Sequence, residues 1–574
     1  MTLNLKTGIL TIDALVSSTW ASKVGEAVTL TYSFMTKPPS DATNDDANGF
    51  QPMTEVQKDG VRTALAAWAA VANVTFQEVS ADGNLQMATN NQGNTSSGYA
   101  YLPNGVDPTY LFTNTQDGYN FAFPPGGFGL AVLIHEIGHT LGLKHPGNYN
   151  STGGDVDGPF LPASLDNISF SQMSYNTGAG FSLHGQYGIT PALYDIRALQ
   201  YLYGVNTTYH TGADTYAFSK TSPLQCIWDA GGIDTFDFSA CTGTTLIDLR
   251  PGGFSSTAPV YNNISIAYNV TIERAIAGNG GSTIYANDAG NVITGGAGND
   301  VIYEGAGSDQ ITGNGGSDTV VFGNALSAYA ISGTSGALLV AGDGVDSLSN
   351  IGNLRFSDGS VDLASFTSFV SGTAGSDALL AGAGNELFTG GAGIDLLRFG
   401  GKRADYVLSA GAGGDIVKDQ SGSGGTDLLA GVERIEFSDN AGLALDTGGA
   451  AGQLYRLYGA MFNRASDDIG MGFWLYRMDH GQSLLSIAKG FINSPEFVRT
   501  YGENAGNDVF VTSLYANVLH RAPDAAGYAV QLNALNNGMS REQLLVNFSE
   551  SAENIELMSH VIPVGVSYTP WLPT

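Results

Sequence analysis

A repeat of nine residues runs through the middle of the chain and restricts its possible folds more than any other feature. From Ala277 onward, aliphatic residues recur at every ninth position, and polar or acidic residues recur at a second fixed phase. A flexible glycine-rich linker would not keep this phase, so the pattern predicts a parallel β-roll. Glycines make its turns, the eighth residue of each unit fills the core, and an Asp at the sixth binds calcium. The aliphatic positions are Ile284, Ile293, Ile302, Ile311 and Val320, and the polar ones are Ser282, Asn291, Asp300, Asp309 and Asp318.

One unit of this array is nearly regular. It reads Gly-Gly-Ala-Gly-Asn-Asp-Val-Ile-Tyr from Gly295, and we expect Gly295, Ala297 and Asp300 to contribute to a calcium site. The earlier turns carry Ser282 and Asn291 where later turns have a carboxylate. We therefore expect those first turns to bind calcium weakly or not at all.

The array occurs a second time. Each array leads into a similar tail, residues 346–358 and 427–439, so the duplicated unit is a roll with a β-rich appendage. The second set of units starts at Gly372, Ala381 and Gly390, with Leu379, Phe388 and Leu397 in phase and Asp377, Glu386 and Asp395 at the ligand position.

A different pattern, His-Glu-Ile-Gly-His-Thr-Leu-Gly-Leu-Lys-His, begins at His135. His135 and His139 are four residues apart, so a helix places both imidazoles on one face, where they can hold one zinc ion. Gly142 is suited to the left-handed turn that ends the helix and returns His145 as a third ligand. Three protein ligands leave a fourth position open, as in catalytic zinc sites, and Glu136 beside the metal can take a proton from water.

An ordinary helix with hydrogen-bonded histidines would explain the five-residue motif, but it does not explain three of the chain's 8 His at this spacing. Downstream, Ser-Gln-Met-Ser-Tyr around Met173 has the form of a Met-turn, with the methionine beneath the imidazoles. The two segments resemble the metzincins. In the serralysin and astacin branches, the resemblance implies that Tyr175 is a further zinc ligand that swings to stabilise the oxyanion. The alternative for Tyr175 is a buried aromatic residue with a hydrogen-bonded hydroxyl.

Segments 227–238 and 270–273 make the resemblance to the serralysins more specific, and it extends over roughly residues 28–322. The resemblance implies calcium ligands at Asp229, Asp234 and Glu273, and it leaves Asp237 open.

Two features of the sequence depart from the family pattern. The chain starts almost at the protease-like region, so we expect any inhibitory propeptide to be short or missing. Residues 568–574 also lack the acidic-then-apolar ending of a serralysin export signal.

Composition favours an exported protein that binds cations. Lys and Arg number 23 against 53 Asp and Glu, a net charge of -30, which disfavours binding to nucleic acid or anionic membranes. The sequence has no apolar run of about 20 residues that would span a bilayer. Residues 1–6 lack the features of a cleavable signal peptide, so export would need another route. Cys226 and Cys241 leave one disulfide or two free thiols open.

Further patterns predict local structure in the first and last parts of the chain. A capping box at Thr54 starts an amphipathic helix, segment 98–102 reads as a strand, and residues 191–204 read as a helix. The resemblance to the metzincins implies that the strand over 98–102 is an exposed edge that can pair with an extended peptide, and an ordinary sheet edge capped by solvent is the alternative. Near the C-terminus, a helical pattern recurs after 57 residues, with Arg464 and Asp467 matched by Arg521 and Asp524. This part resembles a helical domain of unknown function found in bacterial RTX exoproteins. We expect both Asp residues to cap helices rather than ligate a cation.

These observations predict a multidomain protein. An α+β metzincin protease domain (1–206) precedes a β-rich connector with calcium-site segments (207–276). Two parallel β-roll (RTX) domains with appendages follow (277–362 and 363–446), and a duplicated α-helical domain ends the chain (447–574).

The predicted function is that of a secreted, calcium-dependent zinc endopeptidase acting on extracellular or cell-surface proteins, with one catalytic Zn²⁺, several structural Ca²⁺ and Glu136 as general base. The alternative is a calcium-stiffened surface or adhesion protein with an inactive protease scaffold. Intact Glu136 argues against it, because a scaffold needs no base beside the metal. Expected partners are polypeptide substrates and a type I secretion apparatus, the latter implied by the resemblance of the nine-residue units to the calcium-binding repeats of RTX proteins. A proteinaceous inhibitor and cell-surface association through the C-terminal domain stay open.

Overall fold

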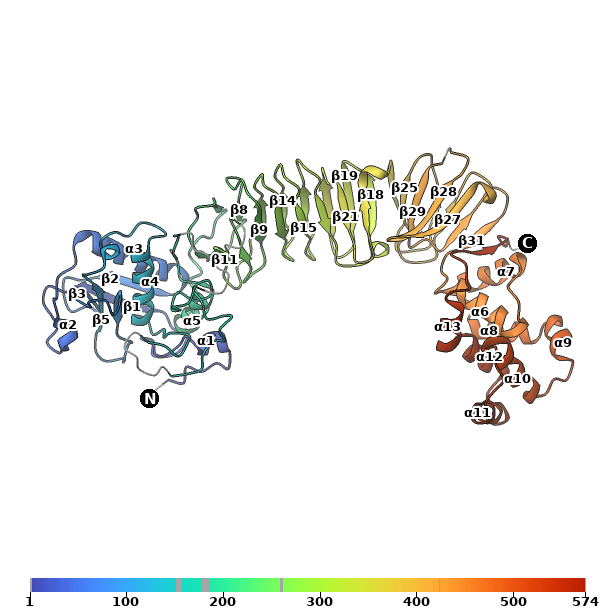
Figure 1. Ribbon diagram of the computed structural model, residues 1–574, viewed down its shortest axis with the longest axis horizontal. Helices are drawn as coiled ribbons and strands as arrows, with labels where there is room; N and C mark the ends of the chain where they lie inside the picture. The colour runs from blue at the N-terminus through green and yellow to red at the C-terminus, as the bar shows by residue number, and fades with distance from the viewer. Residues whose placement is uncertain (1–2, 151–156, 178–184, 259–261, 423, 573–574) are drawn as a thin grey trace. The chain divides into compact units, whose positions relative to one another are not determined.

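The computed structural model describes residues 3–150, 157–177, 185–258, 262–422 and 424–572 (Figure 1). The chain divides into two compact units: unit 1 comprises Met1–Val321 with Leu348–Ile351, and unit 2 comprises Phe322–Ser347 with Gly352–Thr574. The outermost residues of the two termini discussed above, 1–2 and 573–574, lie outside the described residues. Among the described residues, no helix has the length and apolar character needed to cross a bilayer.

The N-terminal part of unit 1 is built on a five-stranded sheet. Its strands are β1 (Val28–Phe34), β2 (Val74–Glu78), β3 (Leu85–Asn90), β4 (Gly98–Ala100) and β5 (Thr109–Asn114). They lie in the order β2-β1-β3-β5-β4, all parallel except β4, which pairs antiparallel with β5 at the edge. The predicted edge strand over 98–102 is confirmed, although it ends at Ala100.

Helices pack against one another beside this sheet and position the histidines. They are α1 (Leu10–Asp13), α2 (Asn44–Ala47), α3 (Glu55–Val71), α4 (Phe128–Thr140) and α5 (Leu193–Tyr203), with a 3-10 turn η1 at Gly118–Phe121. The predicted capping box is present, since Thr54 accepts a hydrogen bond from the backbone N–H of Gln57. Trp68 of α3 is fully buried and donates its indole N–H to the carbonyl of Ile134 in α4, at 3.0 Å. This contact fixes α4, which carries the first two histidines.

The first roll has the predicted parallel architecture. One face contains β8 (Thr235–Asp237), β12 (Arg274–Ile276), β14 (Val292–Thr294) and β16 (Gln310–Thr312), and the other contains β9 (Thr245–Asp248), β13 (Ser282–Tyr285), β15 (Val301–Tyr303) and β17 (Thr319–Val321). Ile302 pairs in register with Ile284 on one side and Val320 on the other, and all three are fully buried. The nine-residue phase therefore marks the core positions, as predicted.

The connector before the roll contributes the short strands β6 (Thr215–Ala217), β7 (Gln225–Ile227), β10 (Phe254–Ser255) and β11 (Ile264–Ile266). Cys226 and Cys241 lie in this region as buried free thiols, which resolves the alternative left open by the sequence.

Unit 2 contains the second roll and its appendages. In the roll, β23 (Ser368–Ser371), β25 (Glu386–Thr389) and β29 (Thr426–Ala430) pair in parallel, and so do β24 (Ala378–Leu380), β26 (Leu396–Arg398) and β30 (Arg434–Glu436). The last strand of each set comes from the tail after the array, so the tail continues the roll. The other strands are β18 (Ala330–Thr334), β19 (Ala337–Ala341), β20 (Val345–Ser349), β21 (Asn353–Arg355), β22 (Ser360–Asp362), β27 (Tyr406–Gly411), β28 (Gly414–Asp419) and β31 (Gly442–Ala444). The last two residues of β20 belong to unit 1.

The C-terminal part of unit 2 is a duplicated helical domain. Its helices are α6 (Ala450–Phe462), α7 (Asp468–Asp479), α8 (Leu484–Ile492) and α9 (Pro495–Tyr501), then α10 (Asn507–Val518), α11 (Ala525–Asn536), α12 (Arg541–Ser549) and α13 (Ala552–Met558). Asp467 and Asp524 accept hydrogen bonds from the N–H groups of Gly470 and Gly527, at 2.7 and 2.8 Å, so the capping prediction is confirmed. The domain is not wholly helical, because β32 (Val566–Tyr568) pairs antiparallel with β31.

Candidate metal centre

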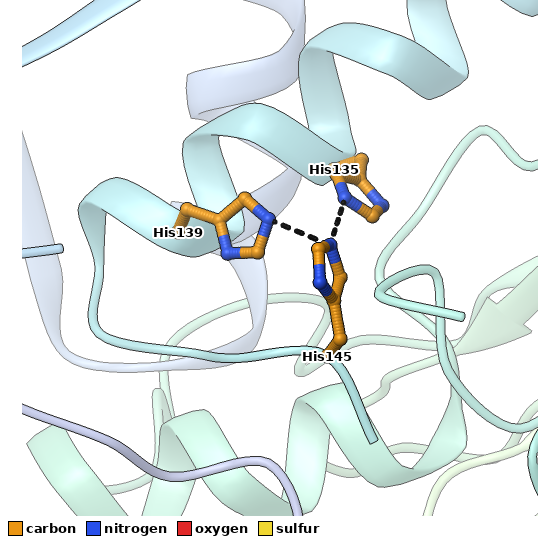
Figure 2. Close-up of side chains that lie close together, drawn as sticks. All are labelled: His135, His139 and His145. Atoms are coloured by element: carbon orange, nitrogen blue, oxygen red, sulfur yellow. Dashed lines mark hydrogen bonds between the residues drawn. The ribbon is translucent and has the colours of Figure 1, made fainter. Parts of the chain in front are cut away.

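The three predicted histidines converge on one point in unit 1 (Figure 2). His135 and His139 project from α4, and His145 returns to them after the turn that ends this helix. The Nε2 atom of His145 lies 3.2 Å from Nε2 of His135 and 3.1 Å from Nε2 of His139. Two ligands of a tetrahedral zinc ion with Zn–N bonds of about 2.0–2.1 Å lie about 3.3 Å apart, so the spacing suits zinc.

The other ring nitrogen of each histidine faces a backbone carbonyl. His135 Nδ1 lies 2.7 Å from the oxygen of Gln172, and His139 Nδ1 lies 2.8 Å from that of Leu143. His145 Nδ1 lies 3.0 Å from the oxygen of Tyr149. Because carbonyl oxygens only accept, each Nδ1 carries a hydrogen, and each neutral ring turns the lone pair of Nε2 toward the other two. A cation between the three converging lone pairs would relieve their mutual repulsion, so the three residues could hold a metal ion.

Burial also favours the neutral form that binds metal. It lowers the pKa of His135 to about 4 and that of His145 to about 3, and it lowers the pKa of His139 well below its usual value. The two neighbouring imidazoles lower the His139 pKa further. The rings are therefore neutral at physiological pH and available as ligands.

Two glycines, one in the turn after α4 and one within the helix, allow close packing around the histidines. Gly142 has φ +99°, the left-handed conformation that the sequence predicted, and a Cβ there would overlap the carbonyl oxygen of Ser18. Gly138 lies against the sulfur of Met173, where a Cβ would stand only 2.5 Å from Sδ. Met173 itself is fully buried, which fits the predicted Met-turn floor.

Glu136 lies deep in the cavity that opens beside the histidines. The cavity has a volume of about 510 Å³, and its lining includes Glu136, His135, Gln172, Tyr175 and Gly98. Burial raises the pKa of Glu136 to about 8. The Oε1 atom of Glu136 lies 3.3 Å from the position that a Cβ on Gly98 would take, so edge strand β4 runs directly past the carboxyl group.

Tyr175 stands against the same histidines. Its ring centroid is 4.5 Å from that of His145 and 5.6 Å from that of His135, and it stacks on Tyr149 at 4.9 Å. The residue is 50% exposed, so it is not the buried aromatic of the alternative reading. The ring is placed where it can reach a substrate bound at the histidines.

Sequence reasoning missed Asp195, which organises the Met-turn. This fully buried carboxylate of α5 accepts hydrogen bonds from Ser171 Oγ (2.6 Å) and the N–H groups of Gln172 (2.7 Å) and Ala192 (2.9 Å). Burial raises its pKa to about 6, against the lowering effect of these donors. An acidic residue on a helix face that is otherwise apolar was the available signal.

A second cluster in unit 1 contains the predicted calcium ligands of the connector. Asp234 Oδ2 is buried and has no hydrogen-bond partner among the described residues, and Asp234 N–H donates to Glu273 Oε2 at 2.8 Å. The ligand atoms of Asp229, His210 and Asp214 lie within 4.8 Å of one another. The last two residues were not predicted, since nothing in their local pattern marks them as ligands. Asp237 instead accepts a hydrogen bond from the N–H of Ser239.

Four acidic positions of the two rolls share one arrangement, in which the carboxylate accepts the backbone N–H of the residue 18 positions earlier. The hydrogen bonds join Ser282 to Asp300 (2.6 Å), Asn291 to Asp309 (2.6 Å), Asp300 to Asp318 (2.8 Å) and Asp377 to Asp395 (2.8 Å). Asp377 accepts instead from the N–H of Thr373, and Glu386 from the hydroxyl of Ser368 and the N–H of Gly382. At Gly295, a Cβ would overlap the carbonyl oxygen of Gly313 and stand 2.7 Å from Asp300 Oδ2, so acceptor oxygens surround the space. Ala297 lies in the same turn, and its N–H donates to Asn279. Carboxylate and carbonyl oxygens of this kind are ligands that suit calcium.

Comparisons with known proteins find calcium-binding repeats and proteins named as metalloproteases. The family model described as the RTX calcium-binding nonapeptide repeat matches residues 276–311, 305–324 and 367–397, and a domain of unknown function (DUF4214) matches 488–558. Serralysin from Proteus mirabilis is 38% identical over 314 residues, which cover 48% of this chain and 63% of that protein. Metalloprotease AprA from Pseudomonas entomophila is 34% identical over 291 residues (46% and 60%), and Serralysin C from Dickeya chrysanthemi is 38% identical over 298 residues (46% and 60%).

The chain thus spans less than two thirds of the length of these relatives. Among solved structures, an extracellular lipase from Serratia marcescens aligns at 14% identity over 27% of this chain and 43% of that chain, with a TM-score of 0.12, which supports no inference about the fold. The calcium-binding repeats and the three relatives thus show that about half of the chain is similar to serralysin-type RTX proteins, and the C-terminal part matches a domain of unknown function.

Proposed function

We propose that the protein is a zinc endopeptidase that acts outside the cell and depends on calcium for its fold. The observation that carries this proposal is the convergence of three neutral imidazoles on one point, with the carboxyl group of Glu136 in the adjoining cavity. Structural zinc sites use four protein ligands, whereas this set of three leaves a position for water. The named relatives, a serralysin and a metalloprotease, support the same activity.

The residues of the cavity have distinct roles in the proposed reaction. Zinc, when bound, polarises water and the scissile carbonyl. Glu136 accepts the proton of the attacking water and delivers it to the leaving amine, and its raised pKa suits both transfers near neutral pH. The hydroxyl of Tyr175 donates a hydrogen bond to the oxyanion that develops on the carbonyl oxygen.

Strand β4 supplies the substrate-binding edge. It is the last strand of its sheet and passes Glu136 at Gly98, so an extended polypeptide can pair with it and bring a peptide bond to the carboxyl group. Backbone pairing of this kind favours unfolded or extended polypeptide over one side-chain sequence. We propose type I secretion as the export route, because the calcium-binding repeats would remain unfolded at the low calcium concentration of the cytosol.

Hydrolysis of casein by the full chain tests the activity. We expect cleavage that a zinc chelator abolishes and added zinc restores. Glu136→Ala should keep zinc and the fold but lose turnover by at least about a hundredfold, since general-base assistance is worth that much. Glu55→Ala, at an exposed position of α3, is the matched control and should cleave normally.

Casein cleavage by Glu136→Ala at the wild-type rate would reject the role of this residue. A zinc-loaded wild-type protein that cleaves no polypeptide would instead favour the surface or adhesion protein with an inactive scaffold.

A further inference from the structure

The loop that carries Tyr175 is tied to one buried carboxylate, that of Asp166, which is 7% exposed. The Oδ1 atom of Asp166 accepts hydrogen bonds from the hydroxyls of Tyr149 and Ser174, both at 2.6 Å. Its Oδ2 atom accepts a side-chain N–H of Asn176 at 3.0 Å. Because hydrogen bonds to a carboxylate are stronger than those between neutral groups, these three contacts anchor the loop firmly.

The contacts hold the backbone of Tyr175 from both sides. Ser174 and Asn176 are its neighbours in the chain, so the carboxylate holds the residue before the tyrosine and the residue after it. The N–H of Tyr175 donates to the hydroxyl of Tyr149 at 3.4 Å, and the two rings stack with their centroids 4.9 Å apart. Tyr175 is therefore held at its backbone, although it is 50% exposed.

Tyr149 connects this anchor to the histidines. Its carbonyl oxygen lies 3.0 Å from His145 Nδ1, while its hydroxyl donates to Asp166. A Cβ on Gly147 would stand 2.2 Å from the Tyr149 ring and 2.5 Å from Asp166 Oδ2, so the absence of a side chain there allows the close approach. One tyrosine thus relates the direction of a candidate zinc ligand to the position of Tyr175.

The position of Tyr175 matters for the reaction proposed above. An oxyanion donor is effective only where it already stands when charge develops, and a displacement of about 1 Å can cost about a hundredfold in rate. An exposed side chain on a mobile loop would not meet this requirement. With its backbone anchored, the ring of Tyr175 moves only by rotation about its own side-chain bonds, which keeps the hydroxyl in the region beside His145.

We propose that Asp166 is a positioning residue, which fixes the backbone of Tyr175 so that the tyrosine hydroxyl meets the oxyanion. Asp166 acts through its partners, because Ser174 and Tyr175 line the cavity and Asp166 binds the hydroxyl of Ser174 from within the protein. The inference rests on the proposed peptidase function and extends it by assigning the group that places the oxyanion donor.

Cleavage of a fluorogenic peptide by the zinc-loaded full chain tests this role. Asp166→Asn places an amide N–H₂ group among three donors, so kcat should fall at least about tenfold through misplacement of the hydroxyl. KM should change much less, because strand β4 remains to bind the substrate backbone. Asp41→Asn is the matched control, since this exposed Asp also accepts a tyrosine hydroxyl, that of Tyr110 at 2.9 Å, and it should behave like the wild type.

A double-mutant cycle with Tyr175→Phe separates positioning from a general loss of structure. Adding Asp166→Asn to Tyr175→Phe should change kcat by less than about twofold, because the hydroxyl through which Asp166 acts is already gone. A double variant that loses the product of the two single losses would overturn the positioning role. A zinc-loaded wild type that cleaves no polypeptide would instead reject the proposed function, and this role with it.

Hydrogen exchange of the metal-free full chain gives a readout that does not depend on activity. Peptides covering residues 168–177 should exchange faster in Asp166→Asn than in the wild type, and peptides covering α3 should be unchanged. Equal exchange over 168–177 would overturn the anchoring.

Tyr149→Phe provides a milder variant that keeps the test decisive if Asp166→Asn does not fold. It removes one donor to Asp166 and the acceptor of the Tyr175 N–H, but it keeps the stacked ring and the carbonyl that faces His145. We expect faster exchange over residues 168–177 and a lower kcat, with zinc affinity nearly unchanged. A folded Tyr149→Phe with wild-type exchange and wild-type kcat would overturn the proposal.

Discussion

The carboxylate of Asp195 and the imidazole of His135 both form hydrogen bonds with the backbone of Gln172. Asp195 accepts the backbone N–H of Gln172 at 2.7 Å, and the carbonyl oxygen of Gln172 accepts the Nδ1–H of His135 at 2.7 Å. Helix α5 thereby helps to orient a metal-binding ring through the backbone of Gln172. Partners of this kind fix the tautomer and direction of a metal-binding histidine.

Replacing the carboxylate of Asp195 should therefore weaken zinc binding. Asp195→Asn keeps the size of the side chain but places an amide N–H₂ group among three donors, so we expect zinc affinity to fall by about 10–100-fold. Competition with a chromophoric chelator measures this change. Asp59→Asn, an exposed position on α3, is the control and should bind zinc like the wild type. Unchanged zinc affinity in Asp195→Asn would mean that the Met-turn keeps its conformation without the Asp195 carboxylate.

The same carboxylate should make stability depend on pH. Burial raises the Asp195 pKa from 3.8 to about 6, so between these values the folded state binds more protons than the unfolded state. The stabilisation from this group is therefore fully present below about pH 3.8 and is lost as the pH rises through about 6. For a pKa shift of this size, the free energy of unfolding should fall by about 3 kcal/mol.

Asp195→Asn cannot ionise and should lose this part of the pH dependence. The thermal midpoint of metal-free Asp195→Asn, relative to that of the metal-free wild type, should rise between pH 4 and pH 7. A constant difference over this range would show that Asp195 titrates alike in the folded and unfolded states.

Tyr175→Phe should separate catalysis from metal binding. The variant keeps the ring that packs on His145 and Tyr149 but loses the hydroxyl, so turnover should fall by about 10²–10³-fold, as when one oxyanion donor is removed. Zinc affinity should change much less, because three imidazoles remain. Parallel measurement of turnover and zinc content decides the question. Equal loss of both would make Tyr175 chiefly a metal ligand.

Gly142→Ala should disturb the turn that returns His145. A Cβ at this position meets both a left-handed φ of +99° and the carbonyl oxygen of Ser18. Gly8→Ala is the matched control, because Gly8 has φ +81° with nothing within 4 Å of a Cβ. We expect about 1 kcal/mol of destabilisation for Gly8→Ala from backbone strain alone. Gly142→Ala should cost clearly more and should also weaken zinc binding, as thermal denaturation with and without zinc would show.

The sequence alone determined the features that depend on local spacing. The intervals in His-Glu-x-x-His-x-x-Gly-x-x-His place three imidazoles through the helix period and one left-handed glycine, whatever packs around them. The nine-residue phase likewise defines which residues face the core of each roll, because each turn repeats the one before it. The helix caps Asp467 and Asp524 belong to the same class, since a cap involves residues only three positions apart.

Tertiary structure alone decided the contacts between residues that are distant in sequence. Asp195 reaches the Met-turn across 23 positions, and Glu433 reaches Asp395 across 38, with no periodic signal to connect them. Likewise, β32 joins the sheet of the second roll although the residues just before it belong to a helical domain. A buried carboxylate or carbonyl must find its partner wherever the packed chain provides one. That partner depends on how the strands and helices assemble, which no local pattern encodes.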